Sequence, residues 1–110
     1  MAVVRIEGLP GAPLAAAAFF HAEWLPRFTA ERGDLVLIFP PADHTHRAWR
    51  LAAVQGLARA AVPHRVNALV GGDAAAIDAA RAYLAAAPGV TGQVLPLDGA
   101  GAGAVIGSAR

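Results

Sequence analysis

Apolar and polar positions follow two different patterns along this 110-residue chain. Four short runs of β-branched and other apolar residues, each closed by glycine or proline, predict strands at Val3–Glu7, Leu35–Phe39, Arg65–Val70 and Gln93–Leu97. The second run, LVLIF, has no polar alternation, which is typical of a strand buried on both faces of a parallel sheet.

Longer segments with bulky apolar residues at helical spacing predict three helices between these strands, at Leu14–Glu31, Thr45–Val62 and from Asp73 to about Ala87. Pro26 lies inside the first helix and predicts a kink, because proline has no backbone N–H and its ring collides with the preceding turn. Asp43 or Thr45 can cap the second helix, and Asp73 can cap the third.

Strands that alternate with helices predict an α/β fold built from consecutive βαβ units. We expect four parallel strands that neighbour one another in sequence order, with right-handed crossovers placing three helices against the sheet. Residues 1–99 then form a single domain, and the Gly/Ala-rich residues 100–110 form a loose tail. A dinucleotide-binding fingerprint needs a helix after its glycines, and too few residues follow the glycines of this tail to form one. We therefore do not interpret them as such a fingerprint.

The predicted central helix, Thr45–Val62, carries apolar residues on more than one face. Its polar positions are Arg47, Arg50, Gln55 and Arg59. A helix that rests on a sheet and faces water on its other side needs one apolar stripe. We therefore expect one face of this helix to pack on the sheet and another to pack on a partner protein.

The composition also favours a partner protein. Of the residues, 56% are hydrophobic and only 15% are charged, whereas average chains have about 25% charged residues. A small domain cannot bury all of this apolar surface, which favours an oligomer. A net charge of +1 argues against partners such as nucleic acid or an anionic membrane. The chain has no cysteine and no apolar run of about 20 residues, so we expect a cytoplasmic protein without a membrane span.

A cleft at the carboxyl ends of the strands is the place where open α/β sheets bind ligands. Here it would be lined by Asp43, His44, His46, Gly71, Gly72 and Asp73. The histidine spacing differs from the i, i+4 pair of a metal-binding helix, so capping and solvent exposure are the favoured interpretation. Asp73 would repel an anion at the glycine turn, so we interpret that turn as structural.

Four segments carry recognisable glycine-bearing patterns, which are GDLVLI (Gly33–Ile38), QGLAR (Gln55–Arg59), RVNALVGG (Arg65–Gly72) and TGQVLPLDG (Thr91–Gly99). Their order and spacing resemble the C-terminal half of the short-chain dehydrogenase/reductase family, with its patterns GxIVNISS, GLTR, RVNxVxPG and TGQxxxVDGG. The resemblance implies a truncated Rossmann-like α/β domain of about four parallel strands and three helices, in the order β-α-β-α-β-α-β.

The sequence departs from the family pattern at the positions of the catalytic and cofactor-binding residues. When Gly56 is placed on the family's helix glycine, Arg47 stands where the catalytic tyrosine would be, and Leu51 stands where the lysine would be. Pro40 falls near the catalytic serine, and no threonine follows Gly72 beside a nicotinamide. The glycine-rich phosphate loop of the family's first half is also missing from the sequence. We therefore expect no cofactor, no metal and no redox catalysis.

Three hypotheses for function follow. In the first, the chain is a non-catalytic subunit that assembles with itself or with a full-length short-chain dehydrogenase. The resemblance implies that it would use the family's helix-pair interface and its last helix and strand. The candidate interface residues are Phe20, Trp24, Phe28, Trp49, Ala53, Gly56, Leu57, Tyr83 and Leu97. In the second, the chain binds a small molecule or performs non-redox chemistry in the cleft described above. In the third, the chain is a truncated product without a selected function.

Overall fold

The computed structural model describes residues 1–28 and 33–97. Its strands are β1 (Ala2–Arg5), β2 (Leu35–Phe39), β3 (Val66–Val70) and β4 (Val94–Pro96), and its main helices are α1 (Pro13–Phe19), α2 (Leu25–Phe28), α3 (Arg47–Ala61) and α4 (Ala74–Ala86). The predicted tail, residues 100–110, and the last positions of the first predicted helix, 29–31, lie outside the described residues.

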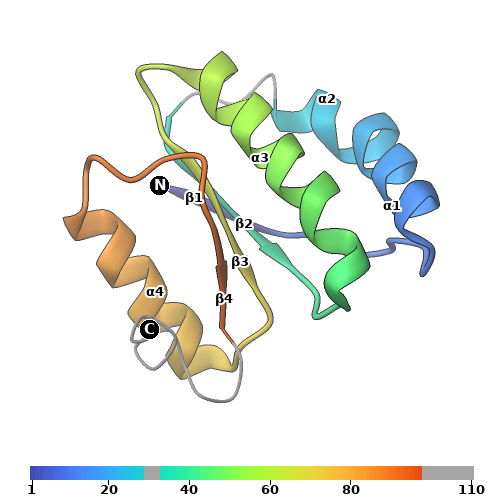
Figure 1. Cartoon of the computed structure of the whole chain (residues 1–110). Helices are drawn as coiled ribbons and strands as arrows, with labels where there is room; N and C mark the ends of the chain where they lie inside the picture. The colour runs from blue at the N-terminus through green and yellow to red at the C-terminus, as the bar shows by residue number, and fades with distance from the viewer. Residues whose placement is uncertain (29–32, 98–110) are drawn as a thin grey trace.

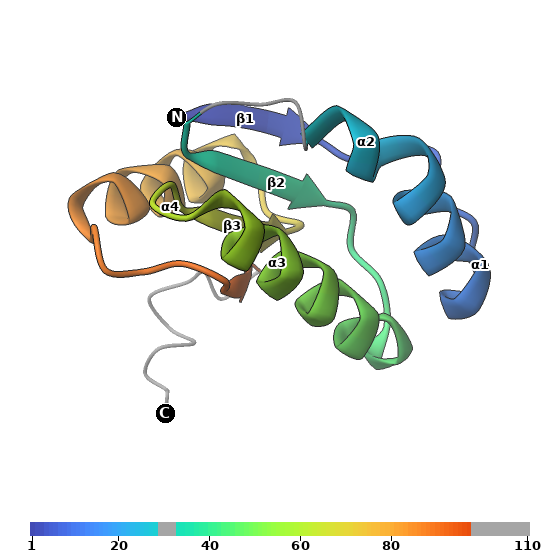
Figure 2. The ribbon, with the colours of Figure 1, turned by 90° about the horizontal axis from the view of Figure 1, so that it is seen from above.

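The four strands form one parallel sheet in the order β1-β2-β3-β4, which confirms the predicted strand order. Leu35 at the start of β2 pairs with Ala2 on one side and with Val66 on the other. Figure 2 shows β1 and β2 running side by side in the same direction. All five residues of β2 are buried, as its continuous apolar run predicted.

The helices are divided between the two faces of the sheet (Figure 1). The helical segments α1, α2 and α3 cover the face that carries Leu35, Leu37 and Phe39, whereas α4 packs on the opposite face against Val36 and Ile38. The strand order continues in one direction, so the β3–α4–β4 crossover has the opposite hand from the first two. The expectation of three right-handed crossovers is therefore wrong for the last one.

The reversed crossover has a physical cause in the sheet and in the turn that follows β3. Three helices on one face would leave Val36, Ile38 and Leu69 exposed on the other, and burying these side chains is favourable. Gly71 and Gly72 have φ angles of +68° and +89°, which turn the chain towards that second face. A Cβ atom on Gly72 would lie 2.7 Å from Cβ of Leu97, so the turn also needs glycine for space.

The first helical segment is continuous but changes pitch ahead of Pro26. A π-helical stretch, Phe20–Trp24, joins α1 to α2, and the N–H of Leu25 donates to the carbonyl of Phe20, five residues earlier. A proline ring collides with the carbonyl four residues before it, and the wider π turn gives the backbone room to avoid that collision. The predicted kink at Pro26 is therefore accommodated as a local widening of the helix.

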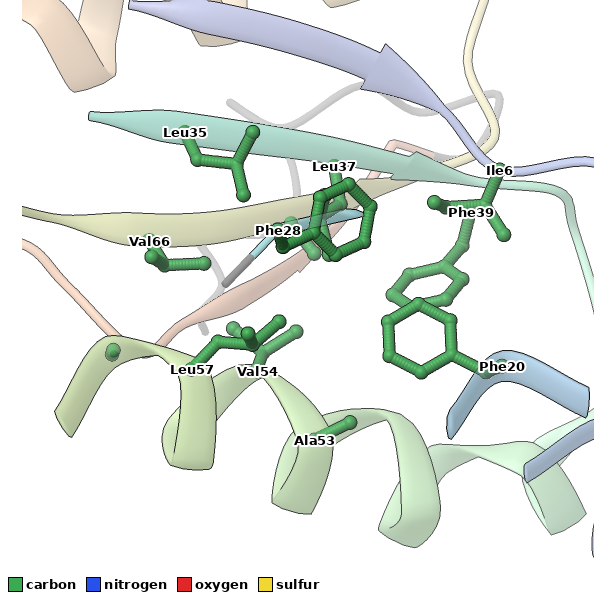
Figure 3. Close-up of a cluster of buried hydrophobic side chains, with 12 residues drawn as sticks. Ile6, Phe20, Phe28, Leu35, Leu37, Phe39, Ala53, Val54, Leu57 and Val66 are labelled. Atoms are coloured by element: carbon green, nitrogen blue, oxygen red, sulfur yellow. The ribbon is translucent and has the colours of Figure 1, made fainter. Parts of the chain in front are cut away.

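The main core lies between the sheet and the layer formed by α1, α2 and α3 (Figure 3). Five of the nine candidate interface residues are buried in the cores of this one chain, namely Phe20, Phe28, Ala53, Leu57 and Leu97. The structure reassigns these five from an outer surface to the interior, because the helices press them against the sheet. Trp24 and Trp49 pack against the same core while half-exposed, and Gly56 is also half-exposed.

Tyr83, on α4, is 53% exposed and is the candidate interface residue that reaches furthest into solvent. Whether it contacts a partner remains a prediction. Within residues 1–28 and 33–97, no helix combines the length and the apolar character that crossing a membrane requires.

Candidate functional site

A pocket of about 370 Å³ opens between the start of α3, the carboxyl end of β3 and residues 93–96, which include β4. Its polar wall consists of Asp43, His44, His46, Arg47, Arg50 and Gln93. Its apolar wall consists of Ala42, Leu51, Val70, Val94 and Pro96. This position matches the cleft that the sequence predicted, at the edge where parallel strands end and helices begin.

The turn that enters α3 shapes one side of the pocket. Pro40 and Pro41 end β2, and Asp43 then caps a 3₁₀ turn, His44–His46, by accepting hydrogen bonds from the backbone N–H and the hydroxyl of Thr45. The Thr45 hydroxyl and backbone N–H hold the pKa of the Asp43 carboxyl below its usual range. The carboxylate of Asp43 is thus ionised at neutral pH and committed to the turn.

His46 is buried, which corrects the expectation that it faces solvent. Its Nε2 lies 3.0 Å from the carbonyl oxygen of Gly11, and its Nδ1 lies 3.1 Å from Nε1 of Trp49. Because the indole N–H can only donate, Nδ1 is the acceptor and Nε2 carries the proton. This arrangement uses both ring nitrogens of His46 to join α3 to the loop before α1, so His46 serves the scaffold of the pocket.

Arg50 is the unusual side chain of the site, because it is only 4% exposed and yet carries a guanidinium. Its Nη1 donates to the carbonyl oxygen of Pro40 at 2.9 Å, and its guanidinium carbon lies 4.6 Å from the ring centre of Phe39. Burial lowers the pKa of Arg50, but the guanidinium stays charged at neutral pH. None of the ion pairs among the described residues includes Arg50.

The sequence located part of this site and missed its central residue. Asp43, His44 and His46 line the pocket as expected, whereas Gly71, Gly72 and Asp73 do not. The last three form a structural turn, in which Asp73 caps α4 by accepting from the N–H of Ala76 at 2.8 Å. That hydrogen bond confirms the prediction that Asp73 caps this helix.

From the sequence alone, Arg50 is only one of the polar positions of the central helix. A signal was available, because Arg50 is spaced three, four and seven residues from Ala53, Val54 and Leu57, which are all buried. An arginine in register with the apolar stripe of a helix is one that the fold must bury.

The motif beginning at Arg65 forms a clamp on the other side of the sheet from the pocket. Nη1 of Arg65 donates to the carbonyl oxygens of Leu84 and Ala87, at 2.9 and 2.8 Å, and so satisfies the end of α4. Nε and Nη2 of the same side chain each lie 3.3 Å from Oδ2 of Asp34. One guanidinium thus joins the segment before β2, the start of β3 and the end of α4.

The third residue of that motif, Asn67, ties β3 to the loop before β4. Its side-chain amide donates to the carbonyl oxygen of Val90 at 3.0 Å and accepts from the N–H of Gln93 at 3.0 Å. In addition, the hydroxyl of Thr91 accepts from the N–H of Val66 at 3.1 Å. The two motifs that open with RVN and TGQ therefore bind each other, and their role in this chain is structural.

The clamp predicts a pH-dependent stability through Asp34. The backbone N–H of Arg65 donates to Oδ1 of Asp34 at 2.9 Å, and this bond, together with the nearby guanidinium, lowers the pKa of the carboxyl. A lowered pKa in the folded state means that the ionised group stabilises the fold above its unfolded value of about 3.9. That contribution is lost as the pH falls through the folded value.

We therefore expect Asp34→Asn to lower the free energy of unfolding by about 1–2 kcal/mol at pH 7, and by much less near pH 3. Urea unfolding of both proteins across this pH range measures the difference. Asp78→Asn is the matched control, since Asp78 is 75% exposed and lies 3.9 Å from Arg81, and such pairs contribute little. A penalty for Asp34→Asn that stays constant with pH would contradict this account.

The positions where the resemblance would place catalytic groups lie at the mouth of the pocket. Arg47 and Leu51 both line it, on consecutive turns at the start of α3, and both are exposed. Within the described ranges, no three histidine or acidic side chains lie close enough together to hold a metal ion. The lining combines basic groups with apolar side chains, which suits recognition of a small ligand.

Comparison with known proteins bears on the origin of this fold. The model of the family described as short chain dehydrogenase-like protein matches residues 4–97, which include every strand and helix of the structure apart from the start of β1. The searches of curated proteins and of solved structures found no match. The match spans most of the chain and includes the clamp motifs, so the chain belongs to the short chain dehydrogenase-like family.

Proposed function

We propose that this chain is a non-catalytic member of its family that acts as an assembling subunit. The proposal is supported by the pair Arg47 and Leu51, which stand where the resemblance would place the family's catalytic tyrosine and lysine and which both line the pocket. A general acid must give up a proton near neutral pH, and neither a guanidinium nor a leucine side chain does so. By contrast, Arg65 and Asn67 of the RVN motif are present and make hydrogen bonds to the end of α4 and to the loop before β4.

The distribution of exposed apolar side chains supports assembly through the face formed by α1 and α3. Among the described residues, the large apolar side chains in the exposed class include Leu14 on α1 at 85%, Leu51 on α3 at 36% and Val62 at the end of α3 at 72%. Figure 1 places these two helices together on one side of the sheet. The exposed Ala52 and the half-exposed Gly56 would allow a second helix to approach α3 closely.

We expect the protein to sediment as a homodimer at micromolar concentration, and Ala52→Arg to weaken the dimer at least about tenfold. The arginine would project from the exposed side of α3 and would be buried without a partner in the interface. Ala85→Arg is the matched control, because Ala85 is equally classed as exposed but lies on α4, on the opposite face of the sheet. Sedimentation velocity of the three proteins measures the difference.

Two further readouts complete this test. The same preparations are titrated with NADH and NADPH, and we expect no change in nicotinamide fluorescence. If the wild-type protein is a monomer and a pull-down recovers no dehydrogenase partner, the assembly proposal fails. Saturable cofactor binding with turnover of a carbonyl substrate would overturn the non-catalytic part.

A further inference from the structure

Arg50 carries a buried charge that the described part of the chain does not balance. Its guanidinium donates one hydrogen bond, to the carbonyl oxygen of Pro40, and lies over the rings of Phe39 and Trp49. Nε of Arg50 is buried and has no hydrogen-bond partner among the described residues. An uncompensated buried cation is costly, and structures that retain one usually supply an anion.

The pocket is the place from which an anion could reach this group. Arg50 forms part of the pocket wall, and Arg47 and His44 add basic groups beside it. The one carboxylate on the wall, Asp43, is occupied by Thr45 and belongs to no ion pair with Arg50. The charges facing the cavity are therefore predominantly positive, although the whole chain is close to neutral.

We propose that this pocket binds a small organic carboxylate, with Arg50 holding the carboxylate group. A planar guanidinium with free donors matches the geometry of a carboxylate. Leu51, Val70 and Val94 also line the pocket and would contact the hydrocarbon body of the ligand. A volume of about 370 Å³ lies at the lower end of the range for small-molecule sites, about 300–1,000 Å³.

The apolar wall distinguishes an organic carboxylate from a free inorganic anion. A guanidinium can bind either anion, but inorganic phosphate has no apolar part to contact Val70, Val94 and Pro96. This inference goes beyond the assembly proposal and does not depend on it. Sedimentation of the same samples with and without ligand keeps the two outcomes separate.

The test uses the wild-type protein and two probes of similar shape, benzoate and the uncharged benzamide. The Nε–H resonance of Arg50 is followed by ¹⁵N-resolved NMR during each titration. We expect benzoate to shift this resonance in a saturable manner, and benzamide to bind at least about tenfold more weakly, because it lacks the charge. A third titration with inorganic phosphate is expected to give no saturable shift.

Variants test whether Arg50 itself is responsible. Arg50→Gln is expected to weaken benzoate binding at least about tenfold, with its fold checked by circular dichroism. Arg59→Gln is the matched control, since Arg59 lies on the exposed side of α3 outside this pocket. Equal affinity of benzoate and benzamide, a response to phosphate alone, or no response to either organic probe would overturn the proposal. If Arg50→Gln fails to fold, the wild-type titrations decide.

Discussion

Replacing Phe20 with alanine is expected to lower the free energy of unfolding by about 3–5 kcal/mol, the range for large aromatic truncations in a core. Phe20 is fully buried at the start of the π-helical stretch, and its ring lies 5.6 Å, centre to centre, from both Phe39 and Trp49. Phe28 adds a third ring at 6.1 Å. The substitution would leave a cavity between the first helical segment, α3 and β2, which the four rings hold together. Figure 3 shows the rings of Phe20 and Phe39 next to each other.

Urea denaturation followed by circular dichroism measures this effect. Phe19→Ala is the matched control, because the neighbouring Phe19 is half-exposed, and its loss should cost clearly less. The comparison also separates two roles for Phe20. If Phe20→Ala left the stability of the monomer unchanged and only weakened association, Phe20 would be an interface residue and its assignment to the core would be wrong.

Arg65→Ala is expected to lower the free energy of unfolding by about 2–4 kcal/mol. The substitution leaves Asp34 without its cation, and it leaves the carbonyl oxygens of Leu84 and Ala87 without their shared donor. The side chain of Arg65 is only 15% exposed, so water would replace these bonds incompletely. Arg65→Lys should recover only part of the loss, because one ammonium cannot reach the carboxylate and the helix end together.

Thermal and urea unfolding of Arg65→Ala are compared with those of Arg81→Ala. Arg81 is 47% exposed and lies 3.9 Å from Asp78, so its loss should cost less than about 0.5 kcal/mol. The double variant Arg65→Ala with Asp34→Asn should be less destabilised than the sum of the two single changes, since both remove the same contact. Strict additivity would show that the clamp does not work as a unit.

Much of the architecture was predictable because local pattern and global fold agree. The continuous apolar run Leu35–Phe39 predicted a strand that is covered on both sides. Glycine and proline residues between the runs marked where the other helices and strands are separated. The strand order then followed from short βαβ connections. The hand of the last crossover was not predictable in this way, because it depends on which face of the sheet still needs cover once α3 is in place.

The site was predicted less completely than the fold. The position of the cleft and three of its lining residues followed from the rule that ligand sites lie at strand ends. The importance of Arg50 depends on burial, and burial depends on how α3 is rotated against the sheet. Likewise, the sequence does not distinguish whether Phe20 and Leu57 lie in the core or in an interface, since both environments are apolar. The structure places both in the core.

The sequence by itself determined the parallel α/β scaffold and the family to which the motifs point. These features rest on residue identity and spacing along one segment. The tertiary structure decided that Arg65 and Asn67 act as clamps, that α4 covers the second face and that Arg50 is a buried cation beside a pocket. Each of these depends on contacts between residues far apart in the chain, and only packing in three dimensions brings such residues together.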